Sequence, residues 1–422
     1  MKHHASGKRP EACRRKGCHI LSRKRIVILG AGYAGLCAAL ALDRLPAVRK
    51  HAEILLVDRH PYHLLKTELH AVAAGLLAPS RAALPLNLLV KRRGVDTLCA
   101  EVTAVHAADG FLEAGGEHVP FDALVAAPGG VVNYYNIPGM EANAQTVTEL
   151  DPALRVRNRV RELARRARAG QGSNIVVVGA GAEGVEVAAY LMDRFVQEVL
   201  PESARPRITL VEGAGLILPG GRYTRSIRRR AQRRMERAGI RIFLNTRVRE
   251  AQPERLVVLE REPLPYDLLI WAGGMLAEPL AAEQLRAKPG PGRRIAVQDT
   301  LNMEQYKNIF VLGDACLFPY GAKSKPLPMA AQYAVQQAET AAHNVAALVV
   351  GRGRMRPFTP ALRGEFVSIG NREAVGWAGP VEMLGSDAQV LKQAILAKHL
   401  ATIGVNPIEW FAGQGPFARR KS

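Results

Sequence analysis

Two short apolar runs, residues 24–29 and 174–178, are each followed at once by a glycine-rich turn and then by a stretch with the composition and length of a helix. Short runs of Val, Ile and Leu bounded by glycine are typical of buried strands. Each unit continues into a second apolar run that ends in an acid, at residues 52–58 and 207–212. The pattern therefore predicts two copies of a strand–helix–strand unit in an α/β fold.

The first glycine turn has the G-x-G-x-x-G spacing of dinucleotide-binding units, with Gly30, Gly32 and Gly35. The first glycine permits the tight turn, the second lets the backbone approach a pyrophosphate at the helix N-terminus, and the third allows the helix to pack closely on the strand. Asp58, at the end of the next strand, is placed to accept hydrogen bonds from ribose hydroxyl groups. These residues predict a nucleotide site in the first unit.

The second unit repeats this arrangement with Gly179, Gly181 and Gly184. Glu212 ends its second strand, and a carboxylate there accepts a hydrogen bond from a free 2′-hydroxyl and repels a 2′-phosphate. We therefore expect NADH rather than NADPH. Arg222 and Arg225 follow Glu212 in sequence, and the alternative is that they bind the 2′-phosphate of NADPH.

An internal duplication accounts for further similarities between the two units. Each is followed by a related segment, FDALVAAPGG from residue 121 and YDLLIWAGG from residue 266, and we assign Gly129 and Gly273 in these segments to the two nucleotide sites. A chain with two dinucleotide sites is suited to passing electrons between two cofactors.

The charge of the chain predicts an anionic partner. Lys and Arg number 58 against 38 Asp and Glu, a formal net charge of +20, which would attract nucleic acid, acidic lipid headgroups or an acidic protein. Aromatic residues do not interleave with the basic runs, so we expect no specific nucleic acid. No run of about 18 apolar residues occurs, so membrane contact should be peripheral.

The five cysteines are too scattered for a disulfide framework, which favours a reducing compartment. Residues 1–23 are basic and lack the apolar core of a secretory signal, so we expect a disordered leader. His and Cys residues in this leader have no second pair at zinc-finger spacing, and we expect no metal site.

The chain returns after the second unit to NIFVLGD, residues 308–314, which makes the second unit an insertion into the first. This arrangement resembles the two-dinucleotide-binding flavoprotein family. The resemblance implies that the first unit holds FAD and the inserted unit holds the nicotinamide nucleotide. It also adds Gly313 and Asp314 to the FAD-binding residues.

Two stretches, VDRHPYHLLKTELHAVAAG from residue 57 and MAAQYAVQQAE from residue 329, resemble type II NADH:quinone oxidoreductases, which are single-subunit enzymes that do not pump protons. The resemblance implies that this stretch, with Gln332, Gln336 and Gln337, lies under the flavin and lines a quinone pocket. Helical spacing places Gln332 and Gln336 on one face and predicts that Gln337 points elsewhere. The resemblance also matches Glu186 to an acid near the nicotinamide, as a positioning residue or proton relay. The alternatives are solvent-facing glutamines on an alanine-rich helix, and an acid favoured by any helix N-terminus.

The glutamine helix should begin near Met329, because the prolines before it prevent an earlier start. A helix N-terminus carries about half a positive charge and would stabilise an anionic reduced flavin. Gln332 and Gln336 are four residues apart and share a face, while Ala331 and Ala334 leave room for a flat acceptor.

The C-terminal region combines a helix-prone stretch at residues 388–403 with Trp410, Phe411, Phe417 and a basic end at 419–421. Aromatic residues followed by cations suit a lipid headgroup interface, and the resembled family also anchors through this region. The alternative is a helix packed on the FAD unit. We expect a peripheral enzyme on the cytoplasmic face of the plasma membrane. Homodimer formation is left as an open possibility.

These observations divide the chain into a leader at 1–23, an FAD unit at 24–150 and 285–379, an inserted NADH unit at 151–284, and an anchoring region at 380–422. Disulfide reductases of the resembled architecture carry a redox-active cysteine pair just after the first nucleotide unit or within the second, whereas Cys37 and Cys99 stand alone here, so we expect electrons to pass directly to a small acceptor. Other acceptors, such as ferredoxin, rubredoxin, sulfide or carotenoid systems, remain alternatives, as does a flavoprotein kept only for binding. The proline in APGG, residues 127–130, departs from the resembled pattern.

Overall fold

The computed structural model describes residues 23–197, 200, 202–221, 223–279, 285–321 and 325–414. Outside the described residues lie residues 1–22 of the expected leader at 1–23, together with Arg222, Phe417 and the basic end at 419–421. Expectations for those segments therefore stay predictions.

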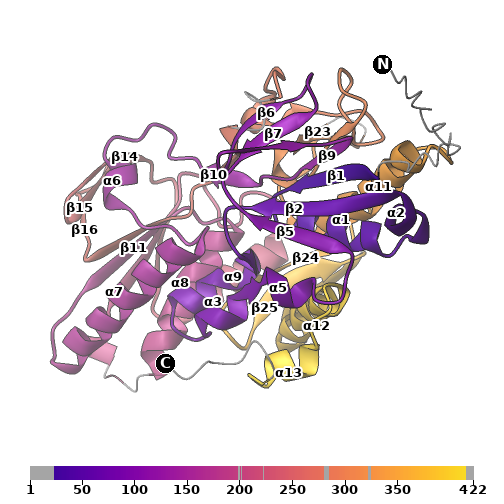
Figure 1. The fold of residues 1–422 in the computed structure, drawn as a ribbon. Coiled ribbons are helices and arrows are strands. Elements are labelled where there is room, and N and C mark those ends of the chain that lie inside the picture. Colours follow the sequence, from indigo (N-terminus) through magenta and orange to yellow (C-terminus); the bar gives the residue numbers. More distant parts are fainter. Residues whose placement is uncertain are drawn as a thin grey trace, which may run out of the picture.

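A five-stranded parallel sheet forms the first unit, in the order β20-β9-β1-β2-β5 (Figure 1). The core strand β1 is apolar and its last four residues are buried, because neighbours cover it on both sides. Strand β20 pairs with β9 although the whole second unit separates them in sequence, which confirms the predicted insertion. The strands are β1 Lys24–Leu29, β2 Ala52–Asp58, β5 Val95–Cys99, β9 Ala123–Ala126 and β20 Ile309–Val311.

The second unit repeats this design with a four-stranded parallel sheet in the order β13-β12-β11-β17. Two parallel sheets, each with a glycine turn after its central strand, confirm the fold class expected from the sequence. Helix α9 buries Ile227, Ala231 and Met235, the face that the sequence predicts. The elements are α7 Leu150–Arg168, β11 Asn174–Val178, α8 Ala182–Gln197, β12 Arg207–Val211, α9 Arg225–Arg237, β13 Arg241–Phe243 and β17 Leu268–Trp271.

A short antiparallel ribbon joins the two units. Strand β10, Gly130–Val132, follows β9, and strand β18, Met275–Ala277, follows β17. They pair from Gly130 with Ala277 to Val132 with Met275, so the chain leaving the first unit is bonded to the chain leaving the second sheet.

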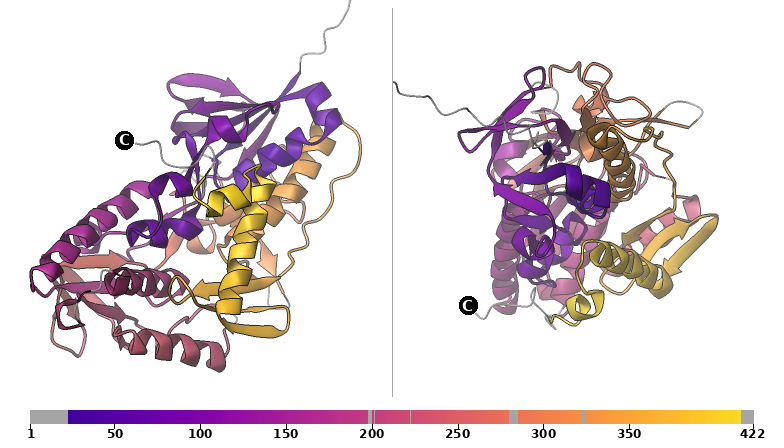
Figure 2. Two further views of the ribbon diagram at one scale, coloured as in Figure 1. Left: turned by 90° about the horizontal axis from the view of Figure 1, so that it is seen from below. Right: turned by 45° about the vertical axis from the view of Figure 1, so that its right-hand side comes forward.

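The C-terminal region begins with a three-stranded antiparallel sheet, β24 Gly364–Ser368, β25 Ala374–Ala378 and β26 Val381–Gly385. Helix α12, Ser386–Thr402, packs on this sheet, and α13, Pro407–Phe411, follows it. Figure 2 shows α12 on the outside of the molecule, in front of the sheets when seen from below. None of the described helices combines the length and the apolar character needed to cross a bilayer.

Trp410 does not have the exposed place that the sequence analysis expects of an interfacial aromatic. Its side chain is buried, its indole N–H donates to the Arg81 carbonyl at 3.0 Å, and the Arg81 guanidinium lies 4.3 Å from the ring centroid. The contact comes from a residue far away in sequence, so local composition could not reveal it. Phe411 beside it is half exposed.

The remaining elements complete these three parts or link them. They are α1 Tyr33–Asp43, α2 Pro46–His51, β3 Tyr62–Leu64, α3 Leu69–Ala73, α4 Pro79–Ala82, β4 Ala83–Pro85, α5 Leu86–Leu89, β6 Val102–His106, β7 Phe111–Ala114, β8 Glu117–Pro120, α6 Met140–Asn143, β14 Val248–Gln252, β15 Arg255–Val258, β16 Leu264–Pro265, β19 Ile295–Ala296, β21 Cys316–Leu317, β22 Pro319–Tyr320, β23 Lys325–Pro326 and α11 Ala331–Val350. Single 3₁₀ turns span Lys66–Glu68, Glu202–Ala204, Pro291–Arg293 and Gly313–Ala315.

Candidate functional site

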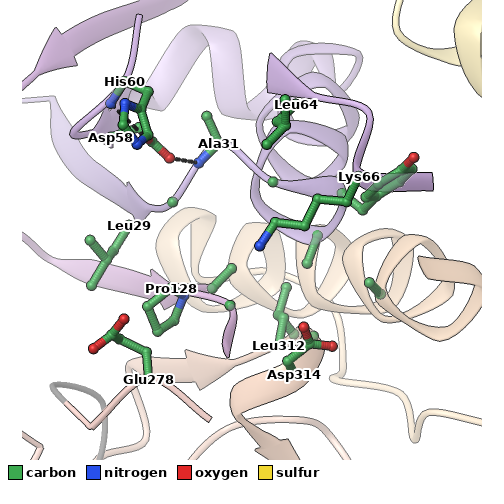
Figure 3. A pocket seen from close by; sticks show the side chains of 18 of the residues that line it. Leu29, Ala31, Asp58, His60, Leu64, Lys66, Pro128, Glu278, Leu312 and Asp314 are labelled. Carbon is green, nitrogen blue, oxygen red and sulfur yellow. Dashed lines mark hydrogen bonds between the residues drawn. The ribbon is translucent and has the colours of Figure 1, made fainter. Parts of the chain in front are cut away.

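A cleft of about 400 Å³ opens at the carboxyl end of the first sheet (Figure 3). The turn after β1, the ends of β2 and β9, the Gly313–Ala315 turn and the start of α11 all contribute to its walls. Ligands of open α/β sheets bind at this edge, because the loops there diverge and the helix N-termini point to it.

The first glycine turn has the geometry that a dinucleotide needs. Gly30 has φ 95°, and a Cβ there would lie 2.2 Å from the Ala127 carbonyl oxygen, so only glycine fits. At Gly32 a Cβ would meet no atom within 4 Å, which leaves the backbone open toward the cleft. The turn therefore provides the open approach that a pyrophosphate requires.

Asp58 supports this turn as well as lining the cleft. Its carboxylate accepts hydrogen bonds from the Ala31 N–H at 2.6 Å and the His60 N–H at 2.8 Å, and the first of these is visible in Figure 3. Such charge-assisted bonds fix the turn, while the remaining lone pairs stay available to ribose hydroxyl groups.

Gln337 holds the opposite wall of the cleft. Its side-chain oxygen accepts a hydrogen bond from the Gly313 N–H at 2.7 Å, and its side chain is 2% exposed. Burial raises the pKa of the neighbouring Asp314, and the Lys66 and Arg294 cations oppose that rise. Gln337 points away from the face of Gln332 and Gln336, as expected, but it is not a bystander, because its side chain supports the Gly313 turn of the cleft.

Helix α11 begins at Ala331, two residues after the expected start. Ala331 and Ala334 line the cleft at the helix N-terminus, as expected of small residues beside a flat ligand. Gln332 and Gln336 are not among the described residues that line it. The Gln336 amide donates to the Ala361 carbonyl at 3.0 Å and accepts from the Ala361 N–H at 2.8 Å, so it is held by backbone.

Lys66 is a cleft residue that the sequence analysis missed. Figure 3 shows its amino group pointing into the space between Ala31 and Asp314, and its nitrogen lies 3.2 Å from the Glu149 carboxylate. Glu278, from the second unit, also lines the cleft. The sequence shows a lysine three residues after the Tyr62-His63 pair, but the direction of its side chain depends on the 3₁₀ turn at Lys66–Glu68.

The second glycine turn repeats the first in atomic detail. Gly179 has φ 100°, and a Cβ there would lie 2.4 Å from the Ala272 carbonyl oxygen, while Gly181 is open. Glu212 accepts from the Ala180 N–H at 2.7 Å and from the Ala214 N–H at 2.8 Å, the counterpart of the Asp58 contacts. The two sites predicted from the duplication thus share one construction.

Glu186 lies in a buried polar network between the second unit and the C-terminal region. It is the fifth residue of α8, just beyond the first turn, so the dipole at the helix N-terminus contributes little to its placement. Its carboxylate is paired with the Lys392 ammonium of α12, accepts from the Ser368 N–H at 2.9 Å and lies 3.5 Å from His70 Nδ1. Burial raises the Glu186 pKa, but Lys392 and His70 outweigh it, so the pKa lies below its ordinary value.

Two further carboxyl groups near Glu186 are poised to change charge. Burial and then repulsion from Glu186 raise the pKa of Glu183 to about 7. Burial also raises the pKa of Glu68 to about 7, against the attraction of Lys392. These groups can hold or release a proton near neutral pH, which the sequence pattern did not indicate.

The two buried cysteines, Cys37 and Cys316, are unsuited to redox chemistry. Cys37, Cys99 and Cys316 are free thiols, and burial raises the pKa of Cys37 and of Cys316 to about 12. A protonated buried thiol is a poor nucleophile. Among the described residues there is also no group of three or more His, Cys, Asp or Glu side chains that could hold a metal ion.

Comparisons with known proteins agree with this construction. Over 394 residues the chain is 29% identical to a type II NADH:quinone oxidoreductase of Staphylococcus aureus, covering 90% of this chain and 96% of the relative. The solved structure of NDH2 from Plasmodium falciparum in complex with NADH superposes with a TM-score of 0.79 at 19% identity, over 94% of this chain and 100% of that one. The sulfide:quinone oxidoreductase of Aquifex aeolicus gives a TM-score of 0.76 at 18% identity, over 90% of this chain and 91% of that one. Residues 24–338 match the pyridine nucleotide-disulphide oxidoreductase family, and the chain belongs to it.

Proposed function

We propose that this chain is a type II NADH:quinone oxidoreductase, which oxidises NADH, reduces a bound FAD and passes the two electrons to a membrane quinone without pumping protons. The observation that carries the proposal is the pair of matching glycine turns, each with an acid bonded to it, in one chain. The unreactive buried thiols Cys37 and Cys316 disfavour an acceptor reduced through a cysteine pair. The Staphylococcus aureus relative supports a quinone as the acceptor.

The first cleft fits FAD. The open backbone at Gly32 and the N-terminus of α1 suit its pyrophosphate, and Asp58 suits its ribose. The N-terminus of α11 and the Lys66 ammonium place positive charge in the cleft. FAD bound there supplies a two-electron centre that accepts hydride from NADH and is reoxidised by the quinone.

The second site positions the nicotinamide nucleotide. The Gly179 turn and the N-terminus of α8 would hold its pyrophosphate, and Glu212 would accept a hydrogen bond from the free ribose hydroxyl. A 2′-phosphate would meet the Glu212 carboxylate, so NADH is preferred over NADPH.

Quinone reduction also requires protons, and Glu186 is our candidate for delivering or relaying one. It is paired with Lys392, close to His70, and near Glu68 and Glu183, whose raised pKa values make them proton stores at neutral pH. Replacement of Glu186 by Gln should alter the pH dependence of quinone reduction. An unchanged pH profile would remove this role.

Gln332 remains the candidate for a side-chain hydrogen bond to the quinone. Among the described residues its amide has no hydrogen-bond partner, so it is free to donate to a quinone carbonyl. Gln336 would have to leave its bonds to Ala361 to do so, which favours Gln332 over Gln336. Gln332→Leu should raise the KM for quinone more than Gln336→Leu does.

The C-terminal region is the proposed membrane contact. Val390 and Ile395 on α12 are 65% and 53% exposed, and Ile408 on α13 is 80% exposed. Exposed apolar side chains gain free energy on entering the acyl boundary, and the net charge of +20 favours an anionic surface. A variant with serine at all three positions should lose binding to vesicles containing anionic lipid, and unchanged sedimentation with vesicles would exclude this contact.

Anaerobic absorbance spectroscopy tests the whole proposal. The purified chain should be yellow, should bleach on addition of NADH, and should regain its colour on addition of a short-chain quinone. Addition of sulfide in place of NADH should leave the colour unchanged. Failure of the quinone to restore colour after NADH bleaching would overturn the quinone assignment.

A further inference from the structure

The ribbon between the two units ends in a turn with unusual backbone angles. After β10, the Asn133 N–H donates to the Gly274 carbonyl at 3.0 Å, and the next residues turn with φ 51° at Tyr135 and φ 55° at Asn136. Tyrosine is unfavourable in this left-handed region because its Cβ crowds the following carbonyl. Such conformations persist only where the surroundings impose them, and they cluster at functional sites.

Specific contacts impose this turn. The Tyr135 N–H donates to the Asn133 side-chain oxygen at 2.9 Å, and the Trp271 indole N–H donates to the Asn133 carbonyl at 2.9 Å. Trp271 is itself buried at the end of β17. These contacts nevertheless leave the Tyr135 side chain 60% exposed. The turn therefore presents an aromatic ring to solvent.

The ring lies beside the second nucleotide site. A Cβ on Gly274 would be 2.9 Å from the Tyr135 hydroxyl oxygen, so the side chain lies directly against this glycine. A Cβ on Gly179, in the second glycine turn, would be 3.0 Å from Gly273 Cα. Tyr135 is therefore separated from the second glycine turn by only the Gly273–Gly274 backbone.

Sheet order decides which half of the nucleotide lies there. In the order β13-β12-β11-β17, Glu212 directly follows β12 on one side of the glycine turn, and β17 lies on the other side. A dinucleotide whose adenosine ribose meets Glu212 and whose pyrophosphate crosses the end of β11 has its nicotinamide half at β17. Gly129 directly precedes β10 and Glu278 directly follows β18; the Glu278 N–H donates to the Gly129 carbonyl at 3.1 Å, and both residues line the first cleft, so this half faces the flavin side.

We propose that Tyr135 is a wall of the NADH site and stacks on the nicotinamide ring, on the face turned away from the flavin. The assignment rests on the proposed function, since it names a binding residue of the same reaction. Stacking would bury the exposed ring of Tyr135 against a flat partner, which offsets the cost of the strained turn. It would also keep the nicotinamide pressed toward the flavin, as hydride transfer requires.

Three variants at one position, prepared as the FAD-loaded protein and reduced anaerobically with dithionite so that NADH cannot transfer hydride to it, test the proposal by calorimetric titration with NADH and with ADP-ribose. Tyr135→Phe keeps the ring and should bind NADH as the parent chain does. Tyr135→Asn, which tolerates the left-handed backbone, should bind NADH about five- to tenfold more weakly. Tyr135→Gly should lose NADH affinity to the same degree while its melting temperature rises, because glycine relieves the strain. ADP-ribose, which lacks nicotinamide, should bind all of them equally.

The outcomes separate the possible roles of the tyrosine. Equal weakening of NADH and ADP-ribose would overturn the proposal, because the turn would then shape the whole site rather than contact the nicotinamide. Unchanged NADH affinity in both Tyr135→Asn and Tyr135→Gly would overturn it as well. A parent chain that binds ADP-ribose but not NADH would overturn the proposed function and this assignment together, whereas NADH binding without dependence on Tyr135 would overturn only the assignment.

Discussion

Replacement of Gln337 by leucine removes the amide that supports the Gly313 turn behind the first cleft and that also hydrogen-bonds with the buried Cys316 thiol. The Gln337 side chain is 2% exposed, and its oxygen accepts the Gly313 N–H at 2.7 Å. Leucine has nearly the same volume but no acceptor, so the substitution leaves a backbone donor without its partner and creates little cavity. A buried donor left unpaired costs about 1–3 kcal/mol.

The size of the expected shift follows from the length of the chain. Unfolding entropy of about 2.1 cal/mol/K per residue gives roughly 0.9 kcal/mol/K for 422 residues. A loss of about 1–3 kcal/mol then lowers the melting temperature by about 1–3 °C, which differential scanning fluorimetry resolves. Because Gly313 and Asp314 line the cleft, the variant should also release FAD more readily on dilution, which flavin fluorescence reports.

Gln332→Leu is the matched control, with the same substitution on the same helix. Among the described residues the Gln332 amide makes no hydrogen bond, so this variant should keep the parent melting temperature to within about 0.5 °C and retain FAD. Equal losses in Gln332→Leu and Gln337→Leu, or no loss in either, would refute the reasoning that Gln337 supports the Gly313 turn.

Three further changes test other contacts. Lys392→Met removes the main cation that holds the Glu186 pKa below its ordinary value; the stability that this low pKa contributes at neutral pH, and that the parent chain loses as the pH falls through it, should be missing in the variant, so the melting temperatures of the two chains should differ most near pH 7 and converge toward pH 4, and a difference that stays constant across pH 4–8 would contradict the pairing. Gly179→Ala places a Cβ 2.4 Å from the Ala272 carbonyl oxygen and should abolish NADH binding by calorimetry while FAD is retained; tight NADH binding would speak against the second site. Glu212→Gln removes the repulsion of a 2′-phosphate and should lower the ratio of kcat/KM for NADH over NADPH by about tenfold; an unchanged ratio would place the selectivity elsewhere.

Sequence reasoning succeeded where the chemistry of a site demands a residue type within a short segment. Gly30 and Gly179 have the left-handed backbone that their turns require, and Asp58 and Glu212 bond to those turns as acids at a strand end can. The return strand at 308–314 revealed the insertion, because a short apolar run that ends in Gly-Asp predicts a buried strand followed by a tight turn. Local spacing was sufficient for all of these.

Residues whose role depends on distant partners were not accessible in this way. The Lys66 side chain is positioned by its ion pair with Glu149, and that of Gln337 by its hydrogen bond with Gly313. The Trp410 side chain is positioned by its hydrogen bond to the Arg81 carbonyl. Each contact joins segments that only the folded chain brings together. Burial is a property of the assembled surface. From the sequence alone, a glutamine or tryptophan side chain is therefore equally consistent with an exposed position and with a buried, structural one.

The β10–β18 ribbon constrains how the two nucleotide units can move. Its hydrogen-bonded ladder pairs Gly130 with Ala277 and Val132 with Met275. A ladder that keeps its side chains on the same faces can slip only in steps of two residues, or roughly 6.6 Å. Small sliding displacements would break its bonds without forming new ones. The ribbon therefore resists sliding of one nucleotide unit along the other, and this would hold the distance between the two nucleotide sites constant from one turnover to the next.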